Sequence, residues 1–368
     1  MLTPEYLEGI EFNKIVKLYT QLNIDITRNI IDKMQDTDLM ITKEQLKILV
    51  RTNGKEIFEQ TLNKTANLSP QVKKELIKLY EDMAKEDLEG YKELFEYRDK
   101  EFKLSDSQIQ ILEQGIKQTN KTLKNFTKTI AFSGQQSYVE AVDRAYLQVA
   151  SGGVDYITAI DNTCKDLAEK GITLKDKAGR DTKIEVAVRR NVLGGIQTTA
   201  NEMNRDLERE LGCNGYEVTA HSGARPSHAE AQGKQYALTK EGARKYGVGF
   251  WGDVEGLWEE ANCRHTYFGI ILGLNEPQYT NKELKHFENN KVTYNGEEIP
   301  EYEATQKQRE LERNIRNTKR TIESLDNEKD KEKYQAKLKK YQKIYNDFSK
   351  QTGLSKQYER TNVYKVKK

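Results

Sequence analysis

Two runs near the C-terminus repeat apolar and aromatic residues at alternating intervals of four and three, which places the side chains along one seam of a helix. The first run is Leu311, Ile315, Thr318, Ile322 and Leu325, and the second is Tyr334, Leu338, Tyr341, Tyr345 and Phe348. The polar stretch DNEKD lies between them. Matching seams joined by a polar turn predict an antiparallel helical hairpin.

The first 130 residues show one helix signal after another. Thr42 and Ser105 each precede a Gln by three positions, which predicts two capping boxes, and Ser69-Pro70 predicts a third helix start. Charged residues make up 32% of the chain, only 5 residues are proline, and the mean hydropathy is -0.86. This composition is typical of a chain that buries apolar surface along narrow helix seams. We expect an elongated helical arm here.

The middle of the chain mixes helix and strand signals. A helix near 136–150 and a helix over 184–212, which ends at a glycine, flank the segment ITLKDKAGRDTKIEV. Alternation around the central Ala-Gly of that segment predicts a small hairpin. Further on, YEVTAH alternates as a strand, HTYFGIILGL predicts a buried strand, and both tryptophans lie between them. We therefore expect a compact α+β module.

The predicted fold class is mainly α with a smaller α+β module. The predicted domains are a helical N-terminal arm at 1–130, an α+β module at 131–300, and a basic helical hairpin with its tail at 301–368.

Positive charge gathers at the C-terminus. The net charge of the chain is +2, but residues 301–368 contain 19 Lys and Arg against 11 Asp and Glu, which leaves residues 1–300 at -6. From Lys331 to Lys368 the count is 12 against 3, which suits contact with phosphates. A solvated helix face explains the same charge. The nucleic-acid contact candidates are Lys337, Lys339, Lys340, Lys343, Lys365, Lys367 and Lys368.

Cys164, Cys213 and Cys263 are widely spaced and form no CxxC pair, which fits a reducing cytoplasm. The N-terminal run MLTPEYLEGIEFNKIVKLY carries three glutamates where a signal peptide needs an apolar stretch, and no segment has 18 consecutive apolar residues. We expect a protein that is made in a soluble state, without a membrane span.

Three of the four histidines fall between residues 221 and 265, in HSGARPSHAEAQGKQY and ANCRHTYFG. His221, His228, Cys263 and His265 offer four N and S donors, enough for one tetrahedral zinc ion, which is the candidate cofactor. Against this, a Cys-x-His pair in a continuing strand would point its donors to opposite faces. The sequence favours a scaffold without a cofactor, in which the imidazoles hydrogen-bond the backbone of an irregular loop region, and a zinc ion is the alternative.

A catalytic interpretation uses the same residues. Arg225 could neutralise a phosphate while His228 and His265 act as general acid or base in a phosphodiester reaction. The chain has no G-x-x-x-x-G-K-[ST], G-x-G-x-x-G, G-x-S-x-G or HExxH motif, so the common nucleotide-dependent and hydrolytic enzymes gain no support. The sequence favours a protein that is not an enzyme.

Taken together and in order, VAVRRNVLGGIQTTANEM, HSGARPSHAEAQGKQY and NCRHTYFG resemble the phage minor capsid protein 2 family, whose members are relatives of the Mu F-like head morphogenesis proteins. The resemblance covers about residues 1–350. Two adjacent glycines in LGGIQ depart from a regular helix. The family's polar motif falls on His221, Arg225, His228, Gln232, Lys234, Asn262, Arg264 and His265.

The resemblance implies a structural protein of the virion of a tailed phage or prophage. It would act in head assembly, associate with the portal or the inner capsid surface, and be made in the bacterial cytoplasm. Its expected partners are portal and major capsid proteins, and relatives that contact DNA or leave with it suggest a link to DNA packaging. The alternative is a phosphodiester-processing or other effector enzyme carried in the phage head.

Overall fold

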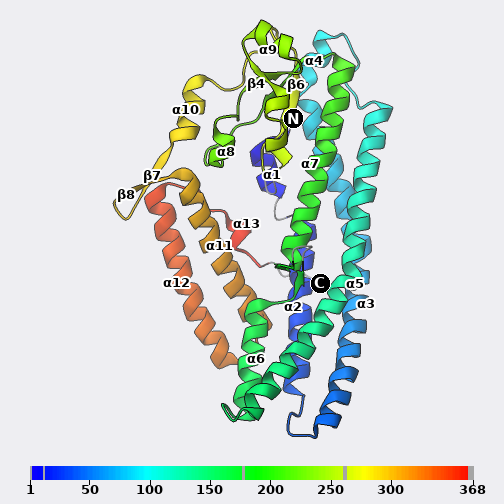
Figure 1. Cartoon of the computed structure of the whole chain (residues 1–368), viewed down its shortest axis with the longest axis vertical. Helices are drawn as coiled ribbons and strands as arrows, with labels where there is room; N and C mark the ends of the chain where they lie inside the picture. Colours follow the sequence, from blue (N-terminus) through cyan, green and yellow to red (C-terminus); the bar gives the residue numbers. More distant parts are fainter. Residues whose placement is uncertain (1, 11–12, 176–178, 260–262, 364–368) are drawn as a thin grey trace.

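The computed structural model describes residues 2–10, 13–175, 179–259 and 263–363, and long helices dominate it (Figure 1). The helices before the first strand are α1 (Pro4–Ile10), α2 (Lys14–Gln35), α3 (Lys43–Glu89), α4 (Lys92–Tyr97), α5 (Asp106–Ala150) and α6 (Tyr156–Lys170). The next long helix, α7 (Ile184–Leu211), lies against α2 and α5. The predicted class, mainly α with small sheets in the middle of the chain, is confirmed.

Side-chain caps begin the long helices where the sequence predicts them. The side chains of Thr42 and Ser105 each accept a hydrogen bond from the backbone N–H three residues later. In both capping boxes the side-chain oxygen of that later residue, a glutamine, accepts a hydrogen bond from the backbone N–H of the capping residue. At the C-terminal end of α7, Gly212 takes the left-handed backbone conformation that ends many helices. A residue with a side chain would be strained in this conformation. The predicted end of this helix is therefore confirmed.

Two predicted helix starts are wrong. Pro70 lies inside α3, and the helix predicted near 136–150 is the last part of α5. An interior proline removes one backbone hydrogen bond and clashes with the preceding turn, at a cost of about 3 kcal/mol. Packing against α5 offsets that cost, because α3 buries Val72, Leu76 and Tyr80 in the main core just after the proline.

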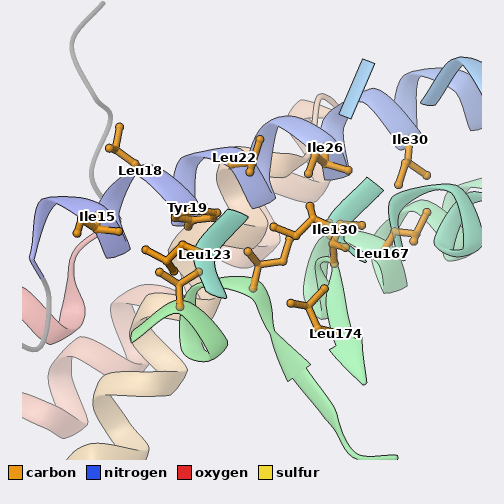
Figure 2. Packing of buried hydrophobic residues seen from close by; sticks show 14 of the residues in the cluster. Ile15, Leu18, Tyr19, Leu22, Ile26, Ile30, Leu123, Ile130, Leu167 and Leu174 are labelled. Carbon is orange, nitrogen blue, oxygen red and sulfur yellow. The ribbon is translucent and has the colours of Figure 1, made fainter. Parts of the chain in front are cut away.

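Helix α2 is the centre of the main hydrophobic core. It contacts α3, α5, α6, α7 and α11 (Glu301–Ser324), and more than half of its residues are buried. Figure 2 shows its apolar side chains meeting those of other elements. The labelled residues of α2 are Ile15, Leu18, Tyr19, Leu22, Ile26 and Ile30, and the others are Leu123, Ile130, Leu167 and Leu174. One helix thus gathers neighbours from both ends of the chain.

A buried polar network crosses this core. Asn23, which is fully buried, donates its side-chain amide to Glu185 Oε2 at 2.9 Å and exchanges two hydrogen bonds with the backbone of Ile172. The other oxygen of Glu185 lies 3.3 Å from a guanidinium nitrogen of Arg320, whose side chain is 2% exposed. Arg320 also donates to the carbonyls of Glu169 and Lys170. The network joins α2, α6, α7 and α11.

Helices α5 and α7 approach closely at the paired glycines of LGGIQ. A Cβ at Gly195 would lie 2.2 Å from Thr119 Oγ1 and 2.5 Å from the Tyr80 hydroxyl, whereas a Cβ at Gly194 would meet nothing within 4 Å. The helix continues through both glycines. Gly195 is therefore required by packing, and Gly194 is not.

Three small sheets accompany the helices in the part of the chain that the structure describes. The predicted hairpin is confirmed as β1 (Thr173–Lys175) paired antiparallel with β2 (Asp181–Lys183). A mixed sheet in the order β5-β4-β3-β6 follows α7, and β7 pairs with β8. The strands of the last two sheets are β3 (Gly215–Val218), β4 (Gln235–Ala237), β5 (Gly249–Phe250), β6 (Tyr267–Ile270), β7 (Lys291–Tyr294) and β8 (Glu297–Pro300).

Strands β3 and β6 confirm the two strands predicted from sequence, although all four residues of each are buried, so β3 lacks the exposed face that alternation implies. Short helices lie between the strands of this sheet and after them in the chain. They are α8 (Pro226–Ala229), α9 (Lys240–Tyr246) and α10 (Asn281–Asn289), with the single-turn 3-10 helices η1 (Trp251–Asp253) and η2 (Glu255–Glu259).

The predicted C-terminal hairpin is confirmed. Helix α11 packs along α12 (Glu328–Thr352), and the short α13 (Tyr358–Thr361) packs on α11. Every residue of the two predicted seams is buried or half-buried. In Figure 1, α12 lies at the outer edge of the molecule, with α11 between it and the other long helices.

No helix in the described part of the chain combines the length and apolar character that crossing a membrane requires.

The two glycines of LGGIQ make a matched pair. We expect Gly195→Ala to lower the free energy of unfolding by about 1–3 kcal/mol, because the added methyl has no room. Gly194→Ala should raise it by about 0.5–1 kcal/mol, since alanine favours the helix and the site is open. Urea denaturation of both variants tests this, and equal shifts would contradict the close approach of α5 and α7.

Candidate functional site

Helix α8 and the segment leading into β6 bring the predicted histidines together. His228 lies in α8, which begins with Pro226 at its first position, where a missing N–H costs nothing. Cys263 and His265 precede β6 in backbone with no regular secondary structure. Because this backbone is irregular, Cys263 and His265 do not point to opposite faces as a Cys-x-His pair in a strand would.

Helix α7 holds the backbone at His265 and at the start of β6 through side-chain hydrogen bonds. Gln197 Nε2 donates to the carbonyl of His265 at 3.1 Å, and Asn204 Nδ2 donates to the carbonyl of Tyr267 at 3.0 Å. These two α7 residues are seven apart, so they lie on one helix face. The hydroxyl of Tyr91 donates to Asn204 and accepts from the backbone N–H of Gly269. The position of His265 therefore depends on the helical body.

Three donor atoms converge in this place. His228 Nδ1 lies 3.4 Å from His265 Nδ1, and Cys263 Sγ lies 3.7 Å and 3.4 Å from those two nitrogens. His228 is 1% exposed, Cys263 is 8% exposed and His265 is 2% exposed. All the donor atoms of this group lie within 4.8 Å of one another, the arrangement that can hold a metal ion.

Gln232 fixes the orientation of the His265 ring. His265 Nε2 donates to Gln232 Oε1 at 2.9 Å, and the same oxygen accepts from the backbone N–H of His221 at 3.0 Å. A neutral imidazole carries one proton, so a protonated Nε2 leaves Nδ1 with a lone pair. That lone pair belongs to the nitrogen that faces Cys263 and His228.

Aromatic rings surround the three donors. The Trp258 ring lies 5.6 Å from the His228 ring and 5.3 Å from the His265 ring, measured between centroids, and Trp258 is 2% exposed. The His221 ring stacks on His265 with centroids 4.6 Å apart. The donors therefore lie in a largely apolar, aromatic environment.

Burial favours the neutral form of the His265 and His221 imidazoles, because it lowers the pKa of each. Desolvation, followed by the nearby His221, His228 and Arg225, lowers the pKa of His265 to about 2. Desolvation is also the largest cause of the lowered pKa of His221. A neutral imidazole can act as a metal ligand, whereas an imidazolium cannot.

The other predicted site residues are not among the three donors. His221 lies beside the cluster, but its Nδ1 donates to the carbonyl of Ser222 at 2.9 Å instead of joining the three donors. Arg225 occupies the N-cap position of α8 without a side-chain capping hydrogen bond, and its charge helps to lower the pKa of His265. Lys234 is exposed, and Arg264 forms an ion pair with Glu8 at 3.2 Å. Asn262 lies outside the described residues.

Sequence reasoning did not single out Trp258, Gln197 or Asn204 for the site. Trp258 lies in the Gly- and Trp-rich segment, which gave a weak signal that it packs near the histidines. Gln197 and Asn204 gave none, because polar residues on a long helix resemble a solvated face until a partner is known.

A family model for phage minor capsid protein 2 matches residues 2–350, nearly the whole chain. The chain belongs to the phage minor capsid protein 2 family. Membership in this family gives the protein a structural role in the phage head, in the virion, among other capsid proteins. Comparison with curated proteins and with solved structures finds no match.

Gln232 and Lys234 are two predicted site residues that lie two positions apart but differ in burial, so they give a paired test. We expect Gln232→Ala to lower the free energy of unfolding by about 1–3 kcal/mol, because two buried N–H donors lose their acceptor. Lys234→Ala should change it by less than about 0.5 kcal/mol, as at most exposed sites. Thermal and urea unfolding measure both, and a neutral Gln232→Ala would contradict the bonding described.

Proposed function

We propose that this minor head protein lies at the inner capsid surface, near the portal, and contacts packaged DNA through the lysines of α12. The proposal gives each part of the chain a role in head assembly. The helical body would contact portal or major capsid subunits, and the C-terminal helical pair would face the genome. Family membership supports the head location, and the charge distribution supports the orientation.

The lysine face of α12 is the observation that carries the DNA contact. Lys337, Lys339, Lys340 and Lys343 are exposed, and no acidic residue occurs between Lys333 and Lys343. The opposite side of the helix is the seam that packs toward α11. Because α12 lies at the edge of the molecule (Figure 1), its lysines can approach an extended polyanion.

The ion pair that Lys337 forms would not prevent DNA binding. Lys337 lies 3.6 Å from Glu169, but both side chains are about half exposed, and exposed pairs contribute little to stability. Phosphate contact can therefore replace this pair at small cost. The C-terminal lysine candidates Lys365, Lys367 and Lys368 lie outside the described residues.

The geometry around the histidines favours this structural role over phosphodiester cleavage. A hydrolytic site has to admit the DNA backbone to the reacting groups. His228 and His265 are at most 2% exposed, and Trp258 packs against both rings.

The DNA contact predicts a salt-dependent change on removing three charges. We expect the triple variant Lys339→Gln, Lys340→Gln, Lys343→Gln to bind duplex DNA more weakly, without preference for sequence. The slope of log affinity against log salt should become shallower by up to about 3, because each lost phosphate contact removes about 0.9. Fluorescence anisotropy at several salt concentrations measures both quantities.

Three exposed lysines of α3 supply the charge-matched control. The variant Lys64→Gln, Lys73→Gln, Lys74→Gln removes the same charge from another helix. It should keep nearly the full affinity and salt slope. Equal losses in the two variants would mean that net charge, and not the α12 face, controls binding and would overturn the proposed orientation.

A further inference from the structure

We infer that His228, Cys263 and His265 bind one zinc ion through Nδ1, Sγ and Nδ1. The inference goes beyond the proposed role in the head, because it stands on the geometry of the α+β region and not on the DNA contact. It names three protein ligands of the ion and leaves one coordination position to an exchangeable ligand.

The spacing of the three atoms matches the edges of a zinc tetrahedron. With Zn–N of about 2.0–2.1 Å and Zn–S of about 2.3 Å, tetrahedral ligands lie about 3.3 Å apart for two nitrogens and about 3.6 Å apart for nitrogen and sulfur. The two nitrogens lie 3.4 Å apart, and the sulfur lies 3.4 Å and 3.7 Å from them. The three distances are therefore those expected for donors around one tetrahedral ion.

The hydrogen bond from His265 to Gln232 is the outer contact that a zinc-bound histidine usually makes. A ligating imidazole donates its other N–H to a neighbouring acceptor, which fixes the ring and the tautomer. The 2.9 Å bond from His265 Nε2 to Gln232 Oε1 does this and directs the Nδ1 lone pair at the other two donors. The orientation therefore exists before an ion arrives.

The donor set selects zinc over the common hard cations. One thiolate and two imidazoles suit zinc, whereas magnesium and calcium prefer oxygen ligands. Binding would release the proton of the Cys263 thiol and place a charge of +2 beside one thiolate. The ion would join α8 to the segment before β6, two parts of the chain separated by 34 residues between His228 and Cys263. We expect it to stabilise this region.

The first experiment is elemental analysis of the tag-free full-length protein, purified without chelators. We expect about one zinc per chain. The triple variant His228→Ala, Cys263→Ser, His265→Ala should hold less than about a tenth of that amount. The matched control His286→Ala, Cys213→Ala removes another histidine and another cysteine and should keep its zinc. Zinc retained by the triple variant would overturn the assignment.

A second measurement does not depend on how the variants fold. Wild-type protein stripped by chelator should take up one equivalent of zinc in competition with a chromophoric chelator, and its melting temperature should rise. Cobalt in place of zinc should give the visible bands of a tetrahedral ion and a thiolate-to-cobalt charge-transfer band. A wild-type protein that contains no metal and takes up none would overturn the proposal.

Discussion

The buried polar network of Asn23, Glu185 and Arg320 is the interaction on which the arrangement of the long helices depends. Its members come from α2, α7 and α11, which are far apart in sequence, and all three are nearly inaccessible to solvent. A buried charge that loses its partner costs several kcal/mol, so only the packing that satisfies Glu185 and Arg320 together is stable. The network therefore fixes α7 relative to α2, α6 and α11.

Helix α7 then determines where the candidate site forms. The same helix that holds Glu185 at its start presents Gln197 and Asn204 further along, and these bond the backbone at His265 and Tyr267. At Gly195, α7 approaches α5 closely, and this approach sets the distance between the two helices. The histidine cluster is thus held by a rigid element, as binding sites that need exact donor positions require.

Much of the fold could be predicted from local signals. The seams of α11 and α12, the capping boxes at Thr42 and Ser105 and the glycine that ends α7 are encoded within a few residues. Pro70 lies inside α3 instead of starting a helix, because its local preference for a helix start is weaker than packing along α5, which a single sequence does not display.

The candidate site could be predicted only in part. The sequence indicated that His228, Cys263 and His265 share one region, but not that His221 turns toward Ser222 or that Gln232 holds His265. Those choices depend on contacts between α8, α7 and the approach to β6, and no residue spacing encodes them.

The central claim is that the buried donors form a zinc centre and not a scaffold of hydrogen bonds alone. Zinc K-edge X-ray absorption of the purified protein tests it most directly. The account predicts one sulfur at about 2.3 Å and two imidazole nitrogens at about 2.0–2.1 Å from the ion. A first shell made only of oxygen and nitrogen, without sulfur, would contradict it.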